Sequence, residues 1–477
     1  MNKSIVLHIM GWILTIEALF MALPCIVAII YQERSGYSFL ITLLSCLIIG
    51  VPLIIIKPKS HIFFAKEGFI SVALGWIVLS IVGALPFYIS GEIPSYVDAL
   101  FEIISGFTTT GSSILSDVEA LSYCMLFWRS LTHWIGGMGI LVFILAIMPM
   151  AGGETMHIMR AESPGPAVEK VVPRMRSTAS LLYLIYFAMT VLQVILLLIG
   201  GMPLFDSLTI TFGSAGTGGF AIKNSSCAEY TAYQQNVITI FMFLFGVNFN
   251  VYTLILFKKA KLALKSEELR SYFLIVVTAI ILIALNLGGF KNFFPSIHHA
   301  AFQVSSIITT TGYATVDFNH WPTFSKTILV WLMFIGACAG STGGGLKVSR
   351  IVILFKTIAK EMSYLVHKRS IKVLKFDGKK IEHETMRSIN VFFISYIMIF
   401  AASVLIVSLD NFDFTSSFTA VAATMNNVGP GLEVVGPIGN FGGFSDLSKF
   451  VMMFDMLCGR LEVFPLLLLF NPKNWKI

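Results

Sequence analysis

Charged residues are scarce in this sequence: only 12% of its 477 residues are Asp, Glu, Lys or Arg. A soluble globular domain carries roughly a quarter of such residues. Hydrophobic residues make up 56% of the chain, and its mean hydropathy is +0.82. Most of the chain must therefore lie in lipid, and the composition excludes an ordinary soluble domain.

Cysteine pairs are also missing. Most of the six cysteines fall in apolar runs and no two form a CxxC pair, so small buried side chains explain them better than disulfides or a metal site. They are Cys25, Cys46, Cys124, Cys227, Cys338 and Cys458.

Motifs of enzymes and of nucleotide-binding domains are absent as well. The chain has no HExxH or GxSxG motif and its nine histidines are scattered, so we predict that it is not an enzyme. No GxGxxG follows a strand pattern, which predicts that the chain itself carries no nucleotide or covalent cofactor. Nothing in the sequence resembles a nucleic-acid module, and we expect no nucleic-acid partner.

Ten apolar runs are each long enough to cross the hydrocarbon core of a bilayer as a helix. The sequence therefore predicts an all-α integral membrane protein with ten transmembrane helices. The runs lie near 8–31, 38–56, 69–90, 122–149, 178–200, 235–257, 271–289, 326–359, 388–409 and 447–470.

Positive charge is distributed unevenly between the loops on the two sides of these ten spans. One alternate set of loops, which includes both termini, holds 26 Lys and Arg residues. By the positive-inside rule, both termini of this multi-pass protein are expected to be cytoplasmic. The opposite set holds only Arg34, Lys223, Lys291, Lys326 and Lys449.

Internal repetition dominates the rest of the chain. After two N-terminal spans in residues 1–67, each of four units has a long helix, a short half-membrane segment, a glycine loop and a second long helix. About ten residues of helix span half a bilayer, so we predict that the short segments are re-entrant pore helices. The four units occupy 68–177, 178–270, 271–387 and 388–477.

The glycine loops suit a selectivity filter. Rings of backbone carbonyls can replace the hydration shell of a monovalent cation, and glycine permits the backbone dihedrals that turn carbonyls inward. One such loop could occur by chance, but four in register favour a single pore. The filter residues that we predict are Thr108, Thr109, Thr110 and Gly111, Ala215, Gly216, Thr217 and Gly218, Thr309, Thr310, Thr311 and Gly312, and Asn426, Asn427, Val428 and Gly429.

The acidic residues near these loops could form a negative vestibule that concentrates cations. Solvated surface charges are an equally good interpretation of each one taken alone. The residues are Glu92, Asp98, Glu102, Asp117, Glu119, Glu433 and Asp446.

A second glycine-rich stretch interrupts the span near 326–359. Four glycines and two hydroxyl residues in six positions cannot hold a regular helix well, so we predict a movable gate below the filter. A helix kink that permits close packing is the alternative. The stretch comprises Gly340, Ser341, Thr342, Gly343, Gly344 and Gly345.

Two arginines lie within predicted spans. Arg460 could face the pore and hinder a cation or hold the gate, or it could form a buried pair with Asp455 or Glu462. Arg129 is explained by anchoring at the membrane interface, and we assign neither it nor His133 a role in transport.

With these motifs, the chain resembles the TrkH/TrkG branch of the potassium transporter superfamily that also includes KtrB and plant HKT proteins. The resemblance covers essentially all 477 residues. It rests on 108–113, 216–220, 309–313, 426–432, the glycine-rich stretch at 340–345 and Arg460.

The resemblance implies potassium as the transported ion, because a glycine at the aligned position of every loop, such as Gly111 in the first, accompanies potassium preference. It also implies a pore-facing Arg460, a homodimer, a bacterial plasma membrane and a cytosolic TrkA-type regulatory subunit with RCK domains. The basic segment 356–387 has acidic membrane lipid as a further candidate partner.

We therefore expect a potassium-translocating pore subunit with a gated filter. The alternative is a secondary transporter that couples K⁺ to H⁺ or Na⁺. Coupling usually requires intramembrane carboxylates or broken helices at a midplane site, and Asp455 and Glu462 are its only candidates here.

Overall fold

The computed structural model describes residues 3–56, 65–139, 175–289, 292–367 and 373–470. Within these ranges, every regular element is helical except two short strands, β1 (Lys375–Phe376) and β2 (Lys379–Lys380), which pair antiparallel. The prediction of an all-α protein is confirmed.

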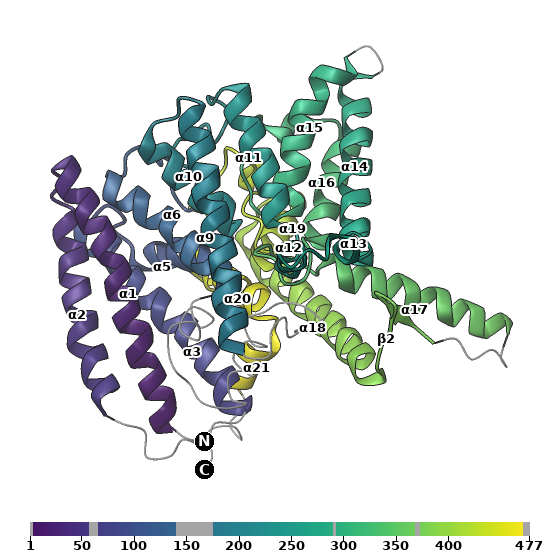
Figure 1. Cartoon of the computed structure of the whole chain (residues 1–477). Coiled ribbons are helices and arrows are strands. Elements are labelled where there is room, and N and C mark those ends of the chain that lie inside the picture. Colours follow the sequence, from purple (N-terminus) through teal and green to yellow (C-terminus); the bar gives the residue numbers. More distant parts are fainter. Residues whose placement is uncertain (1–2, 57–64, 140–174, 290–291, 368–372, 471–477) are drawn as a thin grey trace.

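An antiparallel helix pair, α1 (Lys3–Tyr31) and α2 (Gly36–Ile55), precedes the repeats and lies at one side of the molecule (Figure 1). The two helices approach closely where both carry glycine. A Cβ atom on Gly11 would lie 2.9 Å from the carbonyl oxygen of Gly50. Small residues permit this packing in membranes, where the hydrophobic effect does not drive helices together.

Each predicted unit begins with a long apolar helix. Six helical stretches of the described residues, α1 and α2 among them, are long and apolar enough to cross a membrane, or seven if a sharply bent pair counts as one span. The count of ten spans stays a prediction. The helices that open the four units are α3 (Ala65–Gly83) with α4 (Leu85–Ser90), α9 (Met175–Ile199), α14 (Glu267–Gly288), and α18 (His383–Val407) with the 3₁₀ turn η2 (Ser408–Asp410).

A short helix follows in each unit, as predicted for the pore helices. They have 12 to 16 residues, too few to cross the bilayer, and their C-terminal halves are buried. Side-chain caps fix two of the starts: Ser95 accepts a hydrogen bond from the Asp98 amide, and Asp413 accepts one from the Ser416 amide. The helices are α5 (Tyr96–Phe107), α10 (Leu204–Gly216), α15 (Phe293–Ile308) and α19 (Phe414–Met425).

The second long helix of each unit ends or breaks near the depth of the filter loops. The sequence predicted such an interruption only in 326–359. The elements are α6 (Tyr123–Met138); α11 (Ala232–Phe245), α12 (Phe249–Leu256) and α13 (Ala260–Ala263); α16 (Thr323–Ile335) and α17 (Val348–Val366); and α20 (Asp446–Leu461) and α21 (Phe464–Leu469).

The prediction of continuous helices over 235–257 and 447–470 is wrong. The axis bends by 90° between α11 and α12, and α20 is separated from α21 by Glu462 and Val463, both with positive φ. In the third unit the break runs from Gly336 to Lys347, wider than the predicted 340–345. The part of the predicted span 122–149 beyond Gly139 lies outside the described residues.

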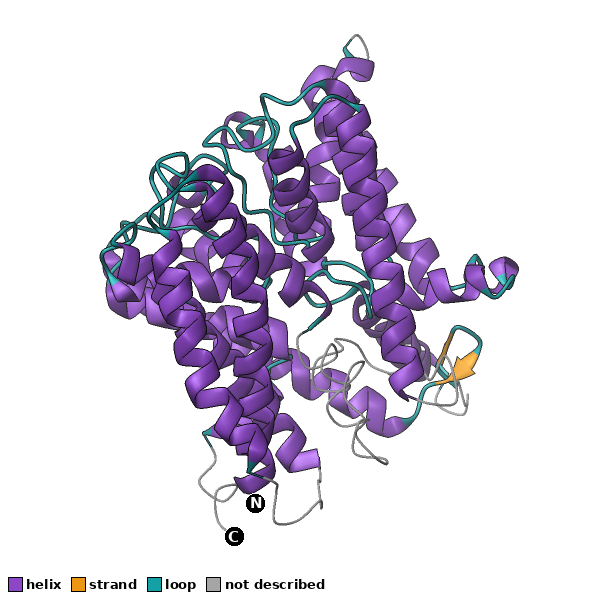
Figure 2. Ribbon diagram, turned by 60° about the vertical axis from the view of Figure 1, so that its left-hand side comes forward, coloured by secondary structure: helices purple, strands orange, loops and turns teal. Residues whose placement is uncertain are grey.

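The segments that follow the pore helices run into the interior of the helical bundle from one end, while β1 and β2 lie toward the other (Figure 2). Short 3₁₀ turns, η1 (Phe318–His320) and η3 (Glu433–Val435), belong to these segments. The fold thus brings four loops from distant parts of the chain to one place.

Candidate selectivity filter and gate

All four pore helices end in the same backbone conformation. In each loop a non-glycine residue with φ between 55° and 59° is followed two positions later by a glycine with φ between 76° and 99°. The pairs are Thr109 and Gly111, Thr217 and Gly219, Thr310 and Gly312, and Asn427 and Gly429.

A shared hydrogen bond confirms this register. The amide between the two left-handed residues donates to the carbonyl five positions earlier, at distances of 2.8 to 2.9 Å. The donors are the amides of Thr110, Gly218, Thr311 and Val428. The glycine equivalent to Gly111 is therefore Gly219, and the alignment of the second loop on Gly218 is off by one residue. Ala215 lies in the last turn of α10 and not in the loop.

The four loops close into a ring. Each left-handed glycine faces a carbonyl oxygen of the next loop so closely that a side chain cannot fit between them. A Cβ atom added to Gly111 would lie 1.9 Å from the Gly218 oxygen, and one added to Gly219 would lie 1.8 Å from the Thr311 oxygen. A Cβ atom added to Gly312 would lie 2.3 Å from the Val428 oxygen, and one added to Gly429 would lie 2.9 Å from the Thr110 oxygen. The order of contacts runs through all four units and returns to the first.

Hydroxyl and amide side chains brace the loops from behind. Thr108 donates to the Ile104 carbonyl at 2.6 Å, and Thr309 donates to the Ser305 carbonyl at the same distance. In the fourth loop, Asn427 donates to the hydroxyl of Thr110 at 2.8 Å, which links the last unit directly to the first. These side chains therefore hold the backbone of the loops.

A cavity of about 120 Å³ opens above the ring, and all four left-handed glycines line it. Arg129 and Lys223 lie in its wall, whereas none of the seven predicted acidic residues is among its described lining residues. Asp98 instead pairs with Lys449, with 2.6 Å between the carboxylate oxygen and Nζ. The negative vestibule predicted from the sequence is therefore not a property of this cavity.

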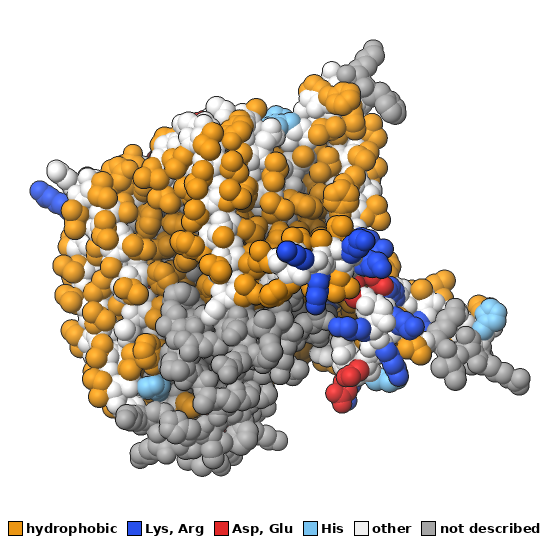
Figure 3. Space-filling model, in the orientation of Figure 1, with side chains coloured by type: hydrophobic (Ala, Val, Ile, Leu, Met, Phe, Trp, Pro, Cys, Tyr) orange, Lys and Arg blue, Asp and Glu red, His pale blue; other side chains and the backbone are white. Residues whose placement is uncertain are grey.

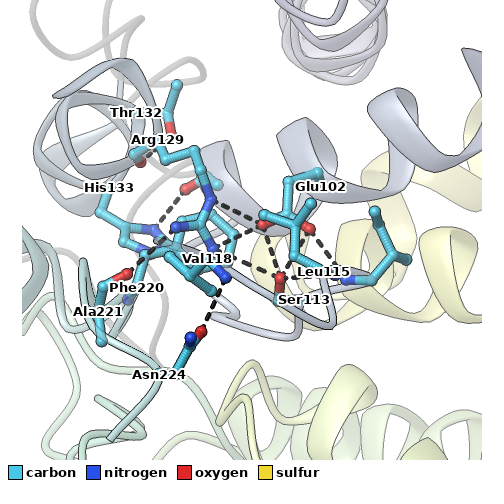
Figure 4. A network of polar contacts seen from close by, with 12 residues as sticks. Glu102, Ser113, Leu115, Val118, Arg129, Thr132, His133, Phe220, Ala221 and Asn224 are labelled. Atoms are coloured by element: carbon cyan, nitrogen blue, oxygen red, sulfur yellow. Dashed lines mark hydrogen bonds and ion pairs between the residues drawn. The ribbon is translucent and has the colours of Figure 1, made fainter. Parts of the chain in front are cut away.

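A buried ion pair between Glu102 of α5 and Arg129 of α6 stands beside the first loop (Figure 4). Arg129 Nη2 lies 2.7 Å and Nε 2.8 Å from Glu102 Oε1, and both side chains are at most 2% exposed. Glu102 also accepts hydrogen bonds from the hydroxyl of Ser113 and the amide of Ile114. Anchoring at the membrane interface is thus the wrong interpretation of Arg129, and Glu102 is not a solvated charge.

The same face of α6 also holds the second loop (Figure 4). The Arg129 guanidinium donates to the Ala221 carbonyl at 3.2 Å and stacks 4.1 Å from the centre of the Phe220 ring. His133 Nε2 accepts the Phe220 amide at 3.1 Å, so Nδ1 carries the proton and donates to the Gly106 carbonyl at 2.8 Å. Two residues of one helix therefore position two of the four loops.

The loop between α16 and α17, residues 336–347, contains the predicted gate and is called the gate loop below; it lies directly against the ring of loops. The Gly345 amide donates to the Asn426 carbonyl at 3.1 Å, and the Gly344 amide donates to the Thr310 hydroxyl at 2.6 Å. A Cβ atom on Gly344 would lie 2.3 Å from the Asn426 oxygen. The loop therefore packs against two of the four loops of the ring, and its role as a movable gate stays a prediction.

Arg460 lies among backbone carbonyls at the same level. It donates to the carbonyl of Thr342 in the gate loop at 3.0 Å, to that of Gly137 at 2.7 Å, and also to that of Gly136. Of the two carboxylates weighed as partners, Glu462 pairs with Arg350 at 2.6 Å and Asp455 accepts the Ser403 hydroxyl at 2.8 Å. Arg460 thus bridges the gate loop and the end of α6.

A family model described as TrkH, a cation transport protein, matches residues 36–477. The chain belongs to the TrkH family. It is 37% identical to the TrkH Trk system potassium uptake proteins of Salmonella typhimurium and Escherichia coli, over 100% of each chain. It is 32% identical to the potassium transporter TrkH of Vibrio parahaemolyticus, whose crystal structure matches with a TM-score of 0.89 over 100% of both chains. This chain is therefore a multi-pass membrane protein of a transporter family.

Sequence reasoning missed several residues that position the four loops of the ring and the loop 336–347 in this TrkH-family chain. Glu102 and Arg129 are opposite charges in one apolar unit, and intramembrane charges usually have a partner, so their pairing left a signal. Asn248, which lies against Gly340, and Glu268, which accepts the Ala339 amide, left no signal in the spacing of the sequence.

Proposed function

We propose that this chain is the pore-forming subunit of a potassium-uptake system, and that K⁺ crosses the membrane through the ring of four loops. The carrying observation is the ring itself, in which equivalent glycines of four units face carbonyl oxygens of their neighbours in a closed cycle. Relatives that match over the whole chain are named as potassium uptake proteins.

The filter would act through main-chain oxygens. Residues 108–111, 216–219, 309–312 and 426–429 would supply carbonyl groups that replace the water of a K⁺ ion, and the C-terminal ends of the four pore helices would favour a cation at the ring. The bracing side chains hold these oxygens in place before the ion arrives, so little reorganisation accompanies dehydration.

Residues 336–347 and Arg460 would form the gate. The loop is packed against the filter, and the fixed positive charge of Arg460 next to it opposes a cation on the same path. Conduction would then require the loop to leave its contacts with Asn426 and Thr310.

The assembly would be a homodimer in a bacterial plasma membrane, with both termini in the cytoplasm and a cytosolic TrkA-type RCK subunit as regulator. The uneven distribution of Lys and Arg supports this orientation. α17 and the β1–β2 hairpin extend from the helical body on the basic side, where a regulator could reach them (Figure 1).

A secondary transporter that couples K⁺ to H⁺ or Na⁺ is not favoured. Its two candidate carboxylates already have partners, Glu462 in an ion pair and Asp455 with a serine hydroxyl. Neither is among the residues that form the ring.

Ion flux into liposomes that hold only this chain tests the function. Replacing K⁺ in turn by Rb⁺ and Na⁺ should give clear K⁺ and Rb⁺ flux and much weaker Na⁺ flux, above that of protein-free liposomes. The K⁺ reversal potential should not change with an imposed proton or sodium gradient. A potential that follows either gradient would establish coupling, and equal flux of all three ions would refute the filter.

A further inference from the structure

The segment between α11 and α14 leaves the direction of the membrane-crossing helices. α12 is turned by 90° from α11, and α12 and α13 lie at the end of α14 from which α17 also departs (Figure 1). Phe249, Val251 and Thr253 of α12 are buried, whereas residues 255–262 are exposed. We call residues 249–265 the elbow; its exposed part is residues 255–265, apart from the buried Ala263.

The exposed part of the elbow contains both apolar and basic residues. Leu256, Leu262 and Leu264 are 61%, 58% and 69% exposed. Between and beside them stand four exposed lysines, Lys258, Lys259, Lys261 and Lys265. Such a pattern is typical of segments that lie in the plane of a bilayer surface, where apolar side chains enter the acyl region and lysines reach the headgroups.

The four lysines have no acidic partner within the described ranges of the chain. Two acidic residues at the end of the elbow are already engaged: Glu267 pairs with Lys356, and Asp377 accepts the hydroxyl of Ser266. Lys and Arg side chains gather around α12, α13 and the hairpin, directly below the apolar belt (Figure 3). Their charge is therefore available to an anionic ligand at that level.

Both ends of the elbow contact the gate loop. At its start, the Phe249 amide donates to the Gly340 carbonyl at 3.0 Å, and Asn248 donates to Glu268 at 3.5 Å. Just past its end, the buried carboxylate of Glu268 accepts the amides of Ala339 at 2.7 Å and Ser349 at 3.2 Å. The Glu268 carboxylate thus joins the two flanks of the gate loop. A shift of the elbow would therefore displace both flanks.

We infer that the elbow is a binding surface for the phosphate headgroups of anionic lipids, and that bound lipid holds the gate loop in the closed arrangement through Asn248 and Glu268. A lipid surface fits better than a soluble protein because exposed leucines stand between the lysines at the edge of the apolar belt. The lipid site stands by itself, whereas its effect on the gate rests on the proposed function.

Lipid retention by the full chain in detergent, followed by native mass spectrometry, tests the site. The elbow variant changes Lys258, Lys259, Lys261 and Lys265 to Gln. The charge-conserving control changes the same four lysines to Arg, which keeps their positive charge. The wild type and the control should retain phosphatidylglycerol over phosphatidylcholine, and the elbow variant should bind phosphatidylglycerol at least about tenfold more weakly.

Equal phosphatidylglycerol retention by the elbow variant and the control would overturn the site. Loss of binding to a regulatory subunit with unchanged lipid retention would assign the surface to a protein instead and equally refute it. If the fourfold variant does not fold, the pair Lys258→Gln and Lys259→Gln is used. Wild-type retention should also weaken as ionic strength rises, and retention independent of salt would count against headgroup binding.

Flux in liposomes tests the link to the gate. Adding phosphatidylglycerol to phosphatidylcholine should lower K⁺ flux of the wild type severalfold, and this effect should vanish in the elbow variant and in Glu268→Gln, but persist in Glu361→Gln. A lipid effect that survives in Glu268→Gln would overturn the link. Absence of K⁺ flux in every lipid would instead refute the proposed function. The retention experiment would still test the lipid-binding site, because it does not depend on flux.

Discussion

The first left-handed residue of each filter loop is not a glycine. Thr109, Thr217, Thr310 and Asn427 all have φ near 55° to 59°. For a residue with a Cβ atom this conformation costs roughly 1–2 kcal/mol. It persists because hydrogen bonds on both sides of each residue fix the turn, as expected where strain is part of a functional site.

Gly219 is the residue at which the ring tolerates least change. Gly219→Ala should reduce K⁺ flux by more than about tenfold, because the new methyl group would lie 1.8 Å from the Thr311 carbonyl oxygen and displace it from the path. Flux of Rb⁺ into liposomes, normalised to the amount of folded protein, measures the effect.

Gly201→Ala is the matched control. Gly201 has nearly the same conformation, with φ of 78° against 76°, but nothing lies within 4 Å of its Cβ position. Both variants carry the same backbone strain, so flux of Gly201→Ala should stay within about twofold of the wild type. Equal loss in the two variants would show that strain, and not crowding of the ring, is responsible.

Arg460→Ala should raise K⁺ flux. The guanidinium donates to the carbonyl of Thr342 and to those of Gly136 and Gly137, and hydrogen bonds to charged groups contribute about 1.5–3 kcal/mol. Losing even one of them should shift the gate toward its open state by about tenfold. Arg387→Ala, at an exposed position on α18, serves as control, and lower flux in Arg460→Ala with normal expression would contradict the idea.

The register of the second loop shows what the sequence could not reveal at this scale. Gly216, Gly218 and Gly219 stand close together, and each could be the glycine that faces the next loop. Composition does not distinguish them, because the choice depends on which residue the end of α10 leaves in the left-handed region. In the first and third loops a single glycine follows the threonines, and in the fourth Gly429 precedes Gly431. In these three loops the glycine that the sequence predicted is the one with positive φ.

At the scale of the elements, the second helix of every unit ends at a similar place relative to the filter loops. α6, α11, α16 and α20 all end after the filter loops have been reached, at Met138, Phe245, Ile335 and Leu461. The last carbonyl groups of a helix have no partner within the helix, and those of Gly136 and Gly137 accept hydrogen bonds from Arg460. Irregular backbone at this depth is possible where protein surrounds it.

The ion pair that joins α5 to α6 should matter more for stability than any exposed pair. Arg129→Gln leaves Glu102 buried without its partner, which costs about 3–5 kcal/mol. The midpoint of thermal unfolding in detergent should fall clearly. The double variant with Glu102→Gln should recover part of the loss.

Lys223→Gln is the control for this pair. It breaks an ion pair with Glu229 whose side chains are 32% and 56% exposed, so water and salt already screen the attraction. Its unfolding midpoint should stay close to that of the wild type. If Arg129→Gln were equally harmless, the buried network could not be what positions the first two loops.

Hydropathy predicted the long helices and the short pore helices well, because lipid demands apolar runs of set length. It failed at the breaks of α11 and α20. The second of these places Glu462 and Val463 in the left-handed region, and neither residue favours it. Only the packing around them, including the pair of Glu462 with Arg350, explains the turn. Local propensity cannot predict a conformation that tertiary contacts impose.

At the scale of the whole molecule, the ring makes the four units depend on one another. Each loop is completed by a carbonyl of the next, and Asn427 joins the fourth unit to the first. The gate loop of the third unit contacts the fourth loop, and Arg460 of the fourth unit contacts the gate loop. No single unit could therefore form the ring.

An ion at the centre of this ring would bind all four units at once, so K⁺ should stabilise the entire chain. A ligand at about 100 times its dissociation constant adds about 2.7 kcal/mol to the stability of the folded state. The unfolding midpoint in detergent should therefore be higher in K⁺ or Rb⁺ than in Na⁺ or N-methyl-D-glucamine at equal ionic strength. Gly219→Ala should lose this difference and Gly201→Ala should keep it. Identical midpoints for the wild type in all four salts would mean that the carbonyl ring does not hold K⁺, whatever its geometry.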